Sequence, residues 1–267
     1  MARDPKGGSD VGRGAGRESD DESPPADREG PEDLLTLYDP AATVSGHIRA
    51  PESTSSPVDA PEHDWAHARD LIYPAFRPIG THGLALDSID REALVGRAAQ
   101  SHAQPLLDLG PAGLPVVYTI DAGGYDIVVN GDHLLSWGVE PSELQDAAMR
   151  NLSAWSATAP WTDEVSGERR LVSSDSGNGW DAARILVPEV IERLVTELGP
   201  FGRVLVGVPE RHLLVAASLQ AGDDDFVALF AEFIVEQSGG ADEPIDRRVL
   251  EIVDGRLVEF SGIRPTA

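Results

Sequence analysis

The chain has 267 residues, of which 46 are acidic and 21 basic, giving a formal net charge of -25. Such a charge repels phosphate backbones and anionic lipid, so nucleic acid and membrane surfaces are not expected partners. The sequence contains no cysteine, which excludes disulfides and thiolate metal ligands. It has neither the run of about 18 apolar residues that a membrane span needs nor the apolar core of a signal peptide, so a cytoplasmic location is expected.

The first 60 residues are predicted to form a disordered acidic arm and linker. Residues 1–30 contain a single branched aliphatic residue, Val11, and cannot bury enough apolar surface to offset the entropy of ordering. The segment PEDLLTLYD is the exception, because its leucines and its initial proline favour a short helix over residues 31–38, either a docking helix or a linear interaction motif. A single folded domain is expected over residues 61–262, with a tail at 263–267.

Prolines and apolar periodicity predict the elements of the first half of this domain. A helix is expected to start at Pro61 and to end before Pro74, and another to run from about Ile89 to Gln100 with Asp87 and Ser88 as caps. The β-branched runs LPVVYTI and YDIVVN, separated by DAGG, predict a hairpin over residues 114–130. A helix with one apolar face follows from Pro141 to Trp155.

Hairpins dominate the second half. After a strand at ERRLVSS and a helix near residue 190, the runs RVLVGV and HLLVAAS predict a second hairpin around Pro209, Glu210 and Arg211. A helix over residues 225–237 precedes a third hairpin with Asp254-Gly255 as a two-residue turn. Hairpins that alternate with single helices indicate an α+β fold, with an antiparallel or mixed sheet and helices packed mainly on one face.

The Gly-rich turn SSDSGNGWD supplies two candidate site residues, Asp181 and Arg184. In one interpretation the backbone amides of the turn bind an anion that Arg184 also contacts. In the other, which we favour, Asp181 caps the following helix and Arg184 pairs with a carboxylate. Pro188 either kinks this helix or starts a second one after a break at Val187, and the second arrangement is less strained.

Two further groups of polar residues are candidates for binding. Arg211 and His212 lie at the predicted turn of the second hairpin, where they could converge with Arg184 or simply be solvated. His63 and His67 have the one-turn spacing of a zinc-binding helix, but Asp64 replaces the glutamate base and no third ligand is indicated. We therefore expect these two histidines to lie on a solvated helix surface, and no metal or cofactor is predicted.

Three segments, WGVEPSELQDAAMRNL, GNGWDAARILVPEVIERL and VGVPERHLLVA, together resemble the YtpQ-like family of bacterial proteins of unknown function (domain of unknown function 1444). The matching positions are Trp137, Gly138, Ala148, Asn151, Leu152, Gly179, Asp181, Arg184, Pro188, Pro209, Arg211 and Leu213. The resemblance covers roughly Ile72 to Phe260 and departs at Glu210 and His212, which replace Asn and Asp of the family pattern. It implies a small cytoplasmic bacterial domain without a known cofactor and adds Trp137 to the candidate binding residues.

The sequence contains no complete catalytic set, which favours a non-enzymatic module that binds a protein partner through a sheet edge or a turn face. The alternative is an enzyme or small-ligand binder with Arg184, Arg211 and His212 around an anion. A third possibility is an immunity-type protein whose acidity suits a basic toxin. Partner identity and oligomeric state are not predicted.

Overall fold

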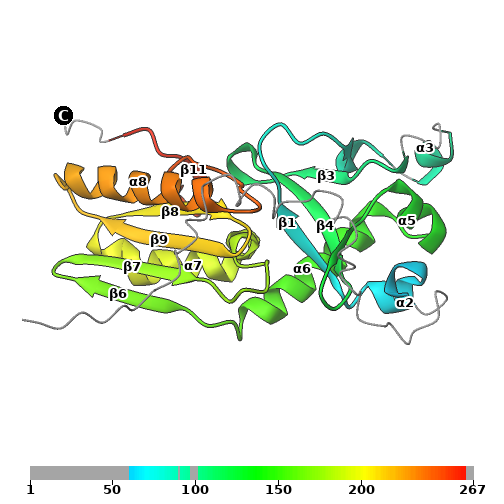
Figure 1. Ribbon diagram of the computed structural model, residues 1–267, viewed down its shortest axis with the longest axis horizontal. Helices are drawn as coiled ribbons and strands as arrows, with labels where there is room; N and C mark the ends of the chain where they lie inside the picture. Colours follow the sequence, from blue (N-terminus) through cyan, green and yellow to red (C-terminus); the bar gives the residue numbers. More distant parts are fainter. Residues whose placement is uncertain (1–59, 90, 97–101, 263–267) are drawn as a thin grey trace, which may run out of the picture. The chain divides into compact units, whose positions relative to one another are not determined.

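The computed structural model describes residues 60–89, 91–96 and 102–262 of the chain (Figure 1). All of them belong to one compact unit, Ser55–Ala267. The predicted arm, of which only Ala60 is described, its short helix and the tail at 263–267 lie outside this part of the chain. The α+β class is confirmed, but the strands form two sheets instead of one.

The first sheet has five strands in the order β1-β4-β3-β2, with β5 also paired to β4. It is mixed, because β2 and β3 are parallel whereas the other pairs are antiparallel. Its strands are β1 (Ile72–Phe76), β2 (Leu84–Ala85), β3 (Leu106–Leu109), β4 (Pro115–Asp121) and β5 (Asp126–Val128). The helices near it are α2 (Trp65–Ala68), α3 (Arg91–Val95), α5 (Gly131–Trp137) and α6 (Pro141–Ser156).

The predicted helix from Pro61 to Pro74 is wrong in its second half. A 3-10 turn (Pro61–His63) and the short α2 end at Ala68, and the chain then enters β1. Pro74 is tolerated there because β1 is an edge strand, where a missing N–H removes no ladder hydrogen bond from the interior of the sheet. The predicted helix over 89–100 is observed only as α3, and residues 97–101 lie outside the described chain.

The second sheet has six strands, all antiparallel, in the order β11-β10-β8-β9-β7-β6. The strands are β6 (Thr162–Ser166), β7 (Arg169–Ser174), β8 (Arg203–Glu210), β9 (Leu213–Leu219), β10 (Leu250–Val253) and β11 (Arg256–Glu259). The two predicted hairpins of the second half are confirmed as β8–β9 and β10–β11, and the turn Asp254-Gly255 has the positive φ angles, 51° and 72°, of a two-residue turn.

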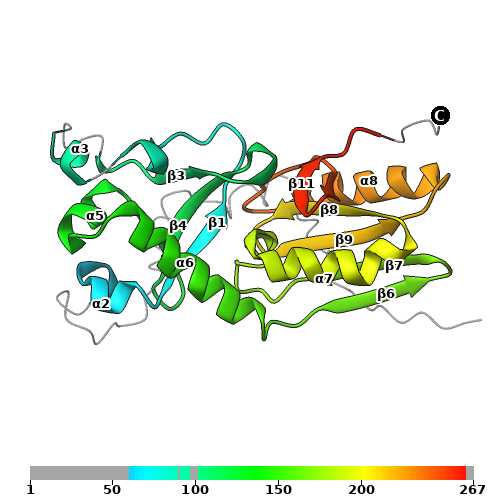
Figure 2. The ribbon, with the colours of Figure 1, turned by 180° about the vertical axis from the view of Figure 1, so that it is seen from behind.

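Helices cover both faces of the six-stranded sheet, whereas the sequence indicated one. Helix α8 (Asp224–Gly240) packs Phe226, Phe230 and Ile234 against one face of β8 and β9, and α7 (Pro188–Leu198) packs on the other. Figure 1 shows α8 in front of the sheet and α7 behind it, and Figure 2, from the opposite side, shows α7 in front. Helix α7 begins at Pro188 after Val187, as the less strained arrangement predicted.

Helix α6 connects the apolar cores of the two sheets. Its Leu144 and Ala148 belong to the core beside the first sheet, and Leu152, one turn later, belongs to the core between α7 and the six-stranded sheet. Strand β1 contributes Phe76 to that second core. The C-terminal end of α6 therefore lies beside the turn that follows β7, where the candidate residues Asp181 and Arg184 are found.

A histidine in the cap of α5 gives the stability a pH dependence. The Asn130 amide donates to Nδ1 of His133, and the His133 amide donates to Oδ1 of Asn130, at 3.1 and 3.2 Å. Burial lowers the pKa of His133 from 6.5, against the raising effects of Glu62 and Asp132. The cap is therefore complete above about pH 6.5 and is lost as the pH falls through the lowered value, because a protonated Nδ1 cannot accept.

We predict that His133→Gln removes this dependence, since glutamine at the same position still accepts from the Asn130 amide but does not titrate. The free energies of unfolding of the wild type and the variant should be similar at pH 8. At pH 5 the wild type should be less stable than the variant by about 1 kcal/mol, which is the usual contribution of a helix cap. Urea unfolding at both pH values measures this, and parallel pH profiles would contradict it.

Candidate functional site

Arg184 lies in a short 3-10 segment (Ala182–Leu186) and is completely buried. Its guanidinium donates to the carbonyl oxygens of Ser156 (2.8 Å), Ala159 (3.3 Å) and Pro160 (3.1 Å). These carbonyls lie at and just beyond the C-terminal end of α6, where a helix leaves acceptors without partners and carries a partial negative charge. Arg184 therefore caps α6, an interaction that the sequence did not indicate.

Asp181 is also buried, and it holds Arg184 through an intermediate hydroxyl. The Ser174 hydroxyl accepts from Arg184 and donates to Asp181, and Ser176 donates to the same carboxylate at 2.8 Å. Asp181 makes no side-chain cap, and Arg184 makes no direct ion pair with it. The expectation that Asp181 caps the following helix is therefore wrong, and the expected pairing of Arg184 with a carboxylate is made only through the Ser174 hydroxyl. The turn still has the structural role that was expected, because the Asp181 carboxylate accepts hydrogen bonds from the hydroxyls of Ser174 and Ser176.

The charge on Arg184 is maintained despite its burial. Burial lowers its pKa to about 10, the Asp181 carboxylate acts in the opposite direction, and Arg193 lowers it further. The indole of Trp161 covers the guanidinium, whose carbon lies 4.0 Å from the ring centroid. At neutral pH the group therefore stays a cation although the side chain is buried.

Arg211 lies at the turn between β8 and β9, as predicted, but its charge is already neutralised. It forms ion pairs with Asp126 of β5 and with Glu243, the second at 3.1 Å. Burial lowers the pKa of Arg211, but these two carboxylates outweigh burial and the pKa is raised overall. Arg77 also contacts Glu243, at 3.5 Å. A pocket of about 690 Å³ at this turn is thus lined by cations that already have anionic partners.

Arg184 and Arg211 line different pockets, so the structure does not bring together the two arginines on which the predicted anion site depended. Gly179 of the Gly-rich turn meets Arg211 instead. Its φ is +81° and a Cβ there would overlap the guanidinium. The Gly-rich turn therefore serves as a surface for the Arg211 side chain.

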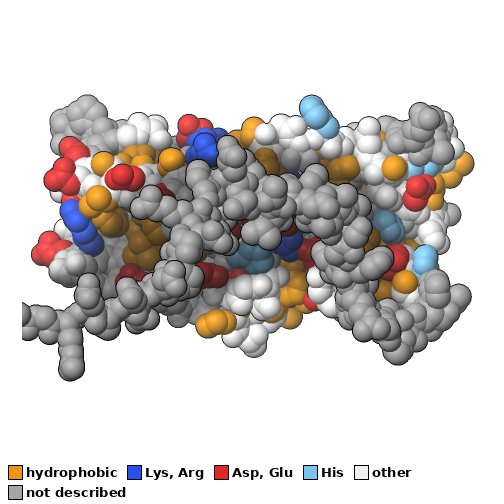
Figure 3. All heavy atoms as spheres, in the orientation of Figure 1, with side chains coloured by type: hydrophobic (Ala, Val, Ile, Leu, Met, Phe, Trp, Pro, Cys, Tyr) orange, Lys and Arg blue, Asp and Glu red, His pale blue; other side chains and the backbone are white. Residues whose placement is uncertain are grey.

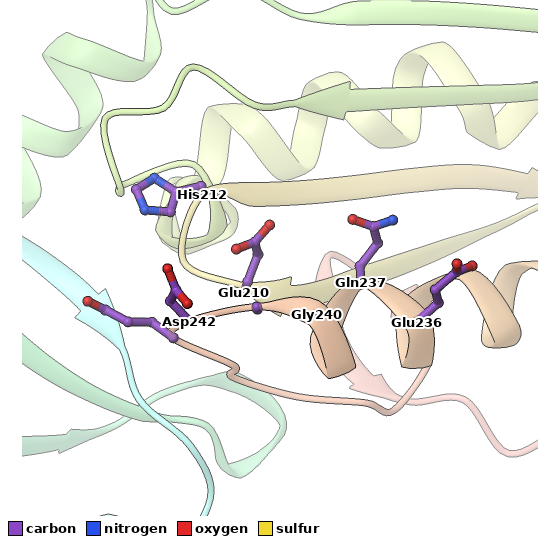
Figure 4. A pocket seen from close by; sticks show the side chains of 8 residues that line it. Glu210, His212, Glu236, Gln237, Gly240 and Asp242 are labelled. Carbon is purple, nitrogen blue, oxygen red and sulfur yellow. The ribbon is translucent and has the colours of Figure 1, made fainter. Parts of the chain in front are cut away.

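His212 lies beside Arg211 and faces a second pocket, of about 510 Å³ (Figure 4). It is surrounded by Glu210 at the end of β8, by Glu236 and Gln237 of α8, and by Asp242, which follows α8. The imidazole Nδ1 is buried and has no hydrogen-bond partner in the part of the chain that the structure describes. The pocket is acidic, so it suits a cationic group, but the described residues include no group of three or more His, Cys, Asp or Glu side chains that could hold a metal ion.

The remaining candidates occupy structural or solvated positions. The indole of Trp137 donates to the carbonyl of Glu62 at 2.8 Å and packs against Trp65, which attaches the first turn of the domain to α5. His63 and His67 are exposed, as expected, and the only ion-pair contact of His67 among the described residues is with Asp64 at 3.9 Å.

An apolar groove that the sequence did not indicate lies between α8 and the β6–β7 hairpin. This β6–α8 groove has a volume of about 380 Å³, and its apolar members are Val165, Leu171, Phe226, Leu229, Phe230 and Phe233. Figure 3 shows hydrophobic side chains gathered in the hollow between these elements. Val165 and Leu229 are 68% and 54% exposed, so the groove presents apolar side chains to solvent.

Strand β6 borders this groove and is the last strand of its sheet. All five of its residues are exposed, and within the described chain the edge that does not face β7 has no strand partner, so its backbone groups face solvent. Two ion pairs fix the neighbouring strand, Arg169 with Asp223 at 2.6 Å and Arg170 with Asp163 at 2.7 Å. Arg169 thus connects β7 to the cap residue of α8, and Arg170 connects β7 to β6.

Comparisons of the chain with family models, with curated proteins and with solved structures find no match. The resemblance to the YtpQ-like family therefore stays a prediction, as does the cytoplasmic location. Among the described helices, none has both the length and the apolar composition to cross a bilayer.

Proposed function

We propose that this protein is a non-enzymatic protein-interaction module that binds an extended segment of a partner along β6 and in the β6–α8 groove. The observation that carries the proposal is the juxtaposition of a fully exposed edge strand with an apolar groove. A strand added to a sheet edge gains main-chain hydrogen bonds, and alternate side chains enter the adjoining pocket. The exposed Val165 and Leu229 supply the apolar contacts.

Charge favours a partner over a second copy of this chain. Glu164 in the middle of β6 has no ion pair among the described residues, and two β6 edges paired together would bring such carboxylates close. The whole chain carries a net charge of -25, which attracts a basic protein. The partner that fits is a basic protein with an extended segment of alternating apolar residues.

Three of the polar candidates support this proposal because most of their polar atoms already have partners. Arg184 caps α6, Asp181 accepts from two serines, and Arg211 pairs with two carboxylates. Activity around an anion held by Arg184 and Arg211 together is therefore not proposed. Membership of the YtpQ-like family is compatible with a binding role and remains part of the proposal.

We predict that the double variant Val165→Asp/Leu229→Asp loses its partner. Immobilised protein is exposed to an extract of the native cells, and captured proteins are compared between variants. Two carboxylates in the groove must be desolvated on binding, so capture should fall at least tenfold, whereas the fold should be kept because both side chains are more than half exposed.

The matched control is Val258→Asp on β11, the strand at the opposite edge of the same sheet, where Val258 is 38% exposed. It should capture the same protein as the wild type. Equal capture by the double variant, or equal loss in the control, would contradict binding at β6.

A further inference from the structure

A small pocket of about 300 Å³ lies between the C-terminal end of α6 and the N-terminal end of α7. Its polar lining includes Ser156, Arg184, Glu189 and Arg193, and the indole of Trp161 forms part of the wall. Ligand pockets of drug-sized molecules range from about 300 to 1,000 Å³, so this one suits a small group.

Two residues that line the pocket carry a buried donor without an acceptor among the described residues. The hydroxyl of Ser156 and the Nε–H of Arg184 make no hydrogen bond within the described chain, although Ser156 is 6% exposed and Arg184 is 0% exposed. Buried polar groups are nearly always paired, so each of these donors requires an explanation. An acceptor bound in the pocket provides one for both.

The N-terminus of α7 adds a third attraction for an anion. This helix has 11 residues, and its cap residue, Val187, offers no side-chain acceptor for the first turn. Pro188 occupies the first position and the Val190 amide donates to the Val187 carbonyl at 3.0 Å, so the Glu189 amide is the one free amide of the first turn within the described chain. The free Glu189 amide and the positive end of the helix dipole favour a negative ligand.

Two guanidinium groups lie against the indole of Trp161. The carbons Cζ of Arg184 and Arg193 lie 4.0 and 5.0 Å from the centroid of Trp161. Arg193 lowers the pKa of Arg184, which expresses the repulsion of two like charges at short range. Arg193 is compensated by Glu197 at 2.8 Å, and among the described residues Glu189 is the one carboxylate that lines the pocket.

We infer that this pocket binds a phosphate group, either as inorganic phosphate or as the monoester of a small molecule. The Ser156 hydroxyl and the Arg184 Nε–H donate to its oxygens, the first turn of α7 faces it, and Arg193 neutralises its second charge. The site differs from the anion site predicted from sequence, because Arg193 and not Arg211 is the second arginine.

Isothermal titration with inorganic phosphate and with phenyl phosphate, at constant ionic strength set by chloride, tests this inference. Saturable binding of the first alone identifies free phosphate, and binding of both identifies a monoester site. Ser156→Ala and Arg193→Gln should each weaken binding at least tenfold, and Glu189→Gln should tighten it. None of these three changes removes a buried hydrogen bond, so folding is preserved.

Arg150→Gln is the control, because Arg150 is exposed on α6 and does not line the pocket. It should leave the affinity unchanged. Absence of saturable heat with both phosphates, or an equal loss in Arg150→Gln and Arg193→Gln, would overturn the inference.

Discussion

Arg184→Ala is expected to lower the free energy of unfolding by about 3 to 5 kcal/mol, the range measured when one member of a buried charged network is removed. The substitution leaves the carbonyls of Ser156, Ala159 and Pro160 without their donor and removes the cation that faces Asp181 through Ser174. Urea unfolding followed by tryptophan fluorescence measures the loss, since Trp161 lies against the guanidinium.

Arg150→Ala serves as the control for this prediction, because Arg150 lies on α6 itself but is exposed and has no partner to lose among the described residues. It should change the stability by less than about 0.5 kcal/mol. Arg184→Lys should recover only part of the loss, since an ammonium group lacks the planar fork that reaches several carbonyls at once. A loss below about 1 kcal/mol in Arg184→Ala would show that the cap contributes little.

Gly202→Ala is expected to be the most damaging small substitution. Gly202 precedes β8 with φ at +151°, and a Cβ there would overlap the backbone of Leu219, whose carbonyl carbon would be 2.6 Å away. The unfavourable backbone conformation and the overlap each cost about 1 to 3 kcal/mol, so the stability should fall by about 2 to 6 kcal/mol. Thermal unfolding measures the change.

Gly199→Ala, three residues earlier, provides the comparison. Gly199 has ordinary helical angles, -57° and -36°, and the nearest atom to an added Cβ is Val195 Cγ1 at 3.7 Å. Alanine fits there and should stabilise by up to about 1 kcal/mol through the unfolded state. If both substitutions had the same effect, the strained conformation of Gly202 would be refuted.

Local chemistry made several elements predictable from the sequence. Pro188 after a β-branched residue predicted the start of α7, and Asp254-Gly255 predicted the turn between β10 and β11. In these places a few adjacent residues restrict the backbone strongly enough to decide its path. The same holds for Pro141 at the start of α6.

Other elements depend on contacts that sequence patterns do not record. Strand β6 reads TDEVS and has no apolar alternation, because both of its faces are exposed, so only its pairing with β7 defines it. Pro74 indicated the end of a helix but lies in β1, where an edge position accepts it. Tertiary pairing decided both cases.

The candidate site shows the same limit. Arg184 and Arg211 were correctly singled out as unusual, but their partners are distant in sequence: the carbonyl of Ser156 lies 28 residues from Arg184, and Asp126 lies 85 residues from Arg211. A buried arginine that caps another helix has no local signature. The β6–α8 groove was missed because its apolar residues come from the β6–β7 hairpin and from a helix more than 50 residues later, and only the fold joins them.

Site-specific photo-crosslinking tests the proposed function most directly. A photoreactive amino acid replaces Val165 in the groove or, as the control, Val258 at the opposite edge of the sheet. Binding at β6 predicts a discrete crosslinked partner from the Val165 position, with the crosslink mapped to an extended, basic and apolar segment, and none from Val258. A partner crosslinked equally from both positions, or from neither, would contradict it.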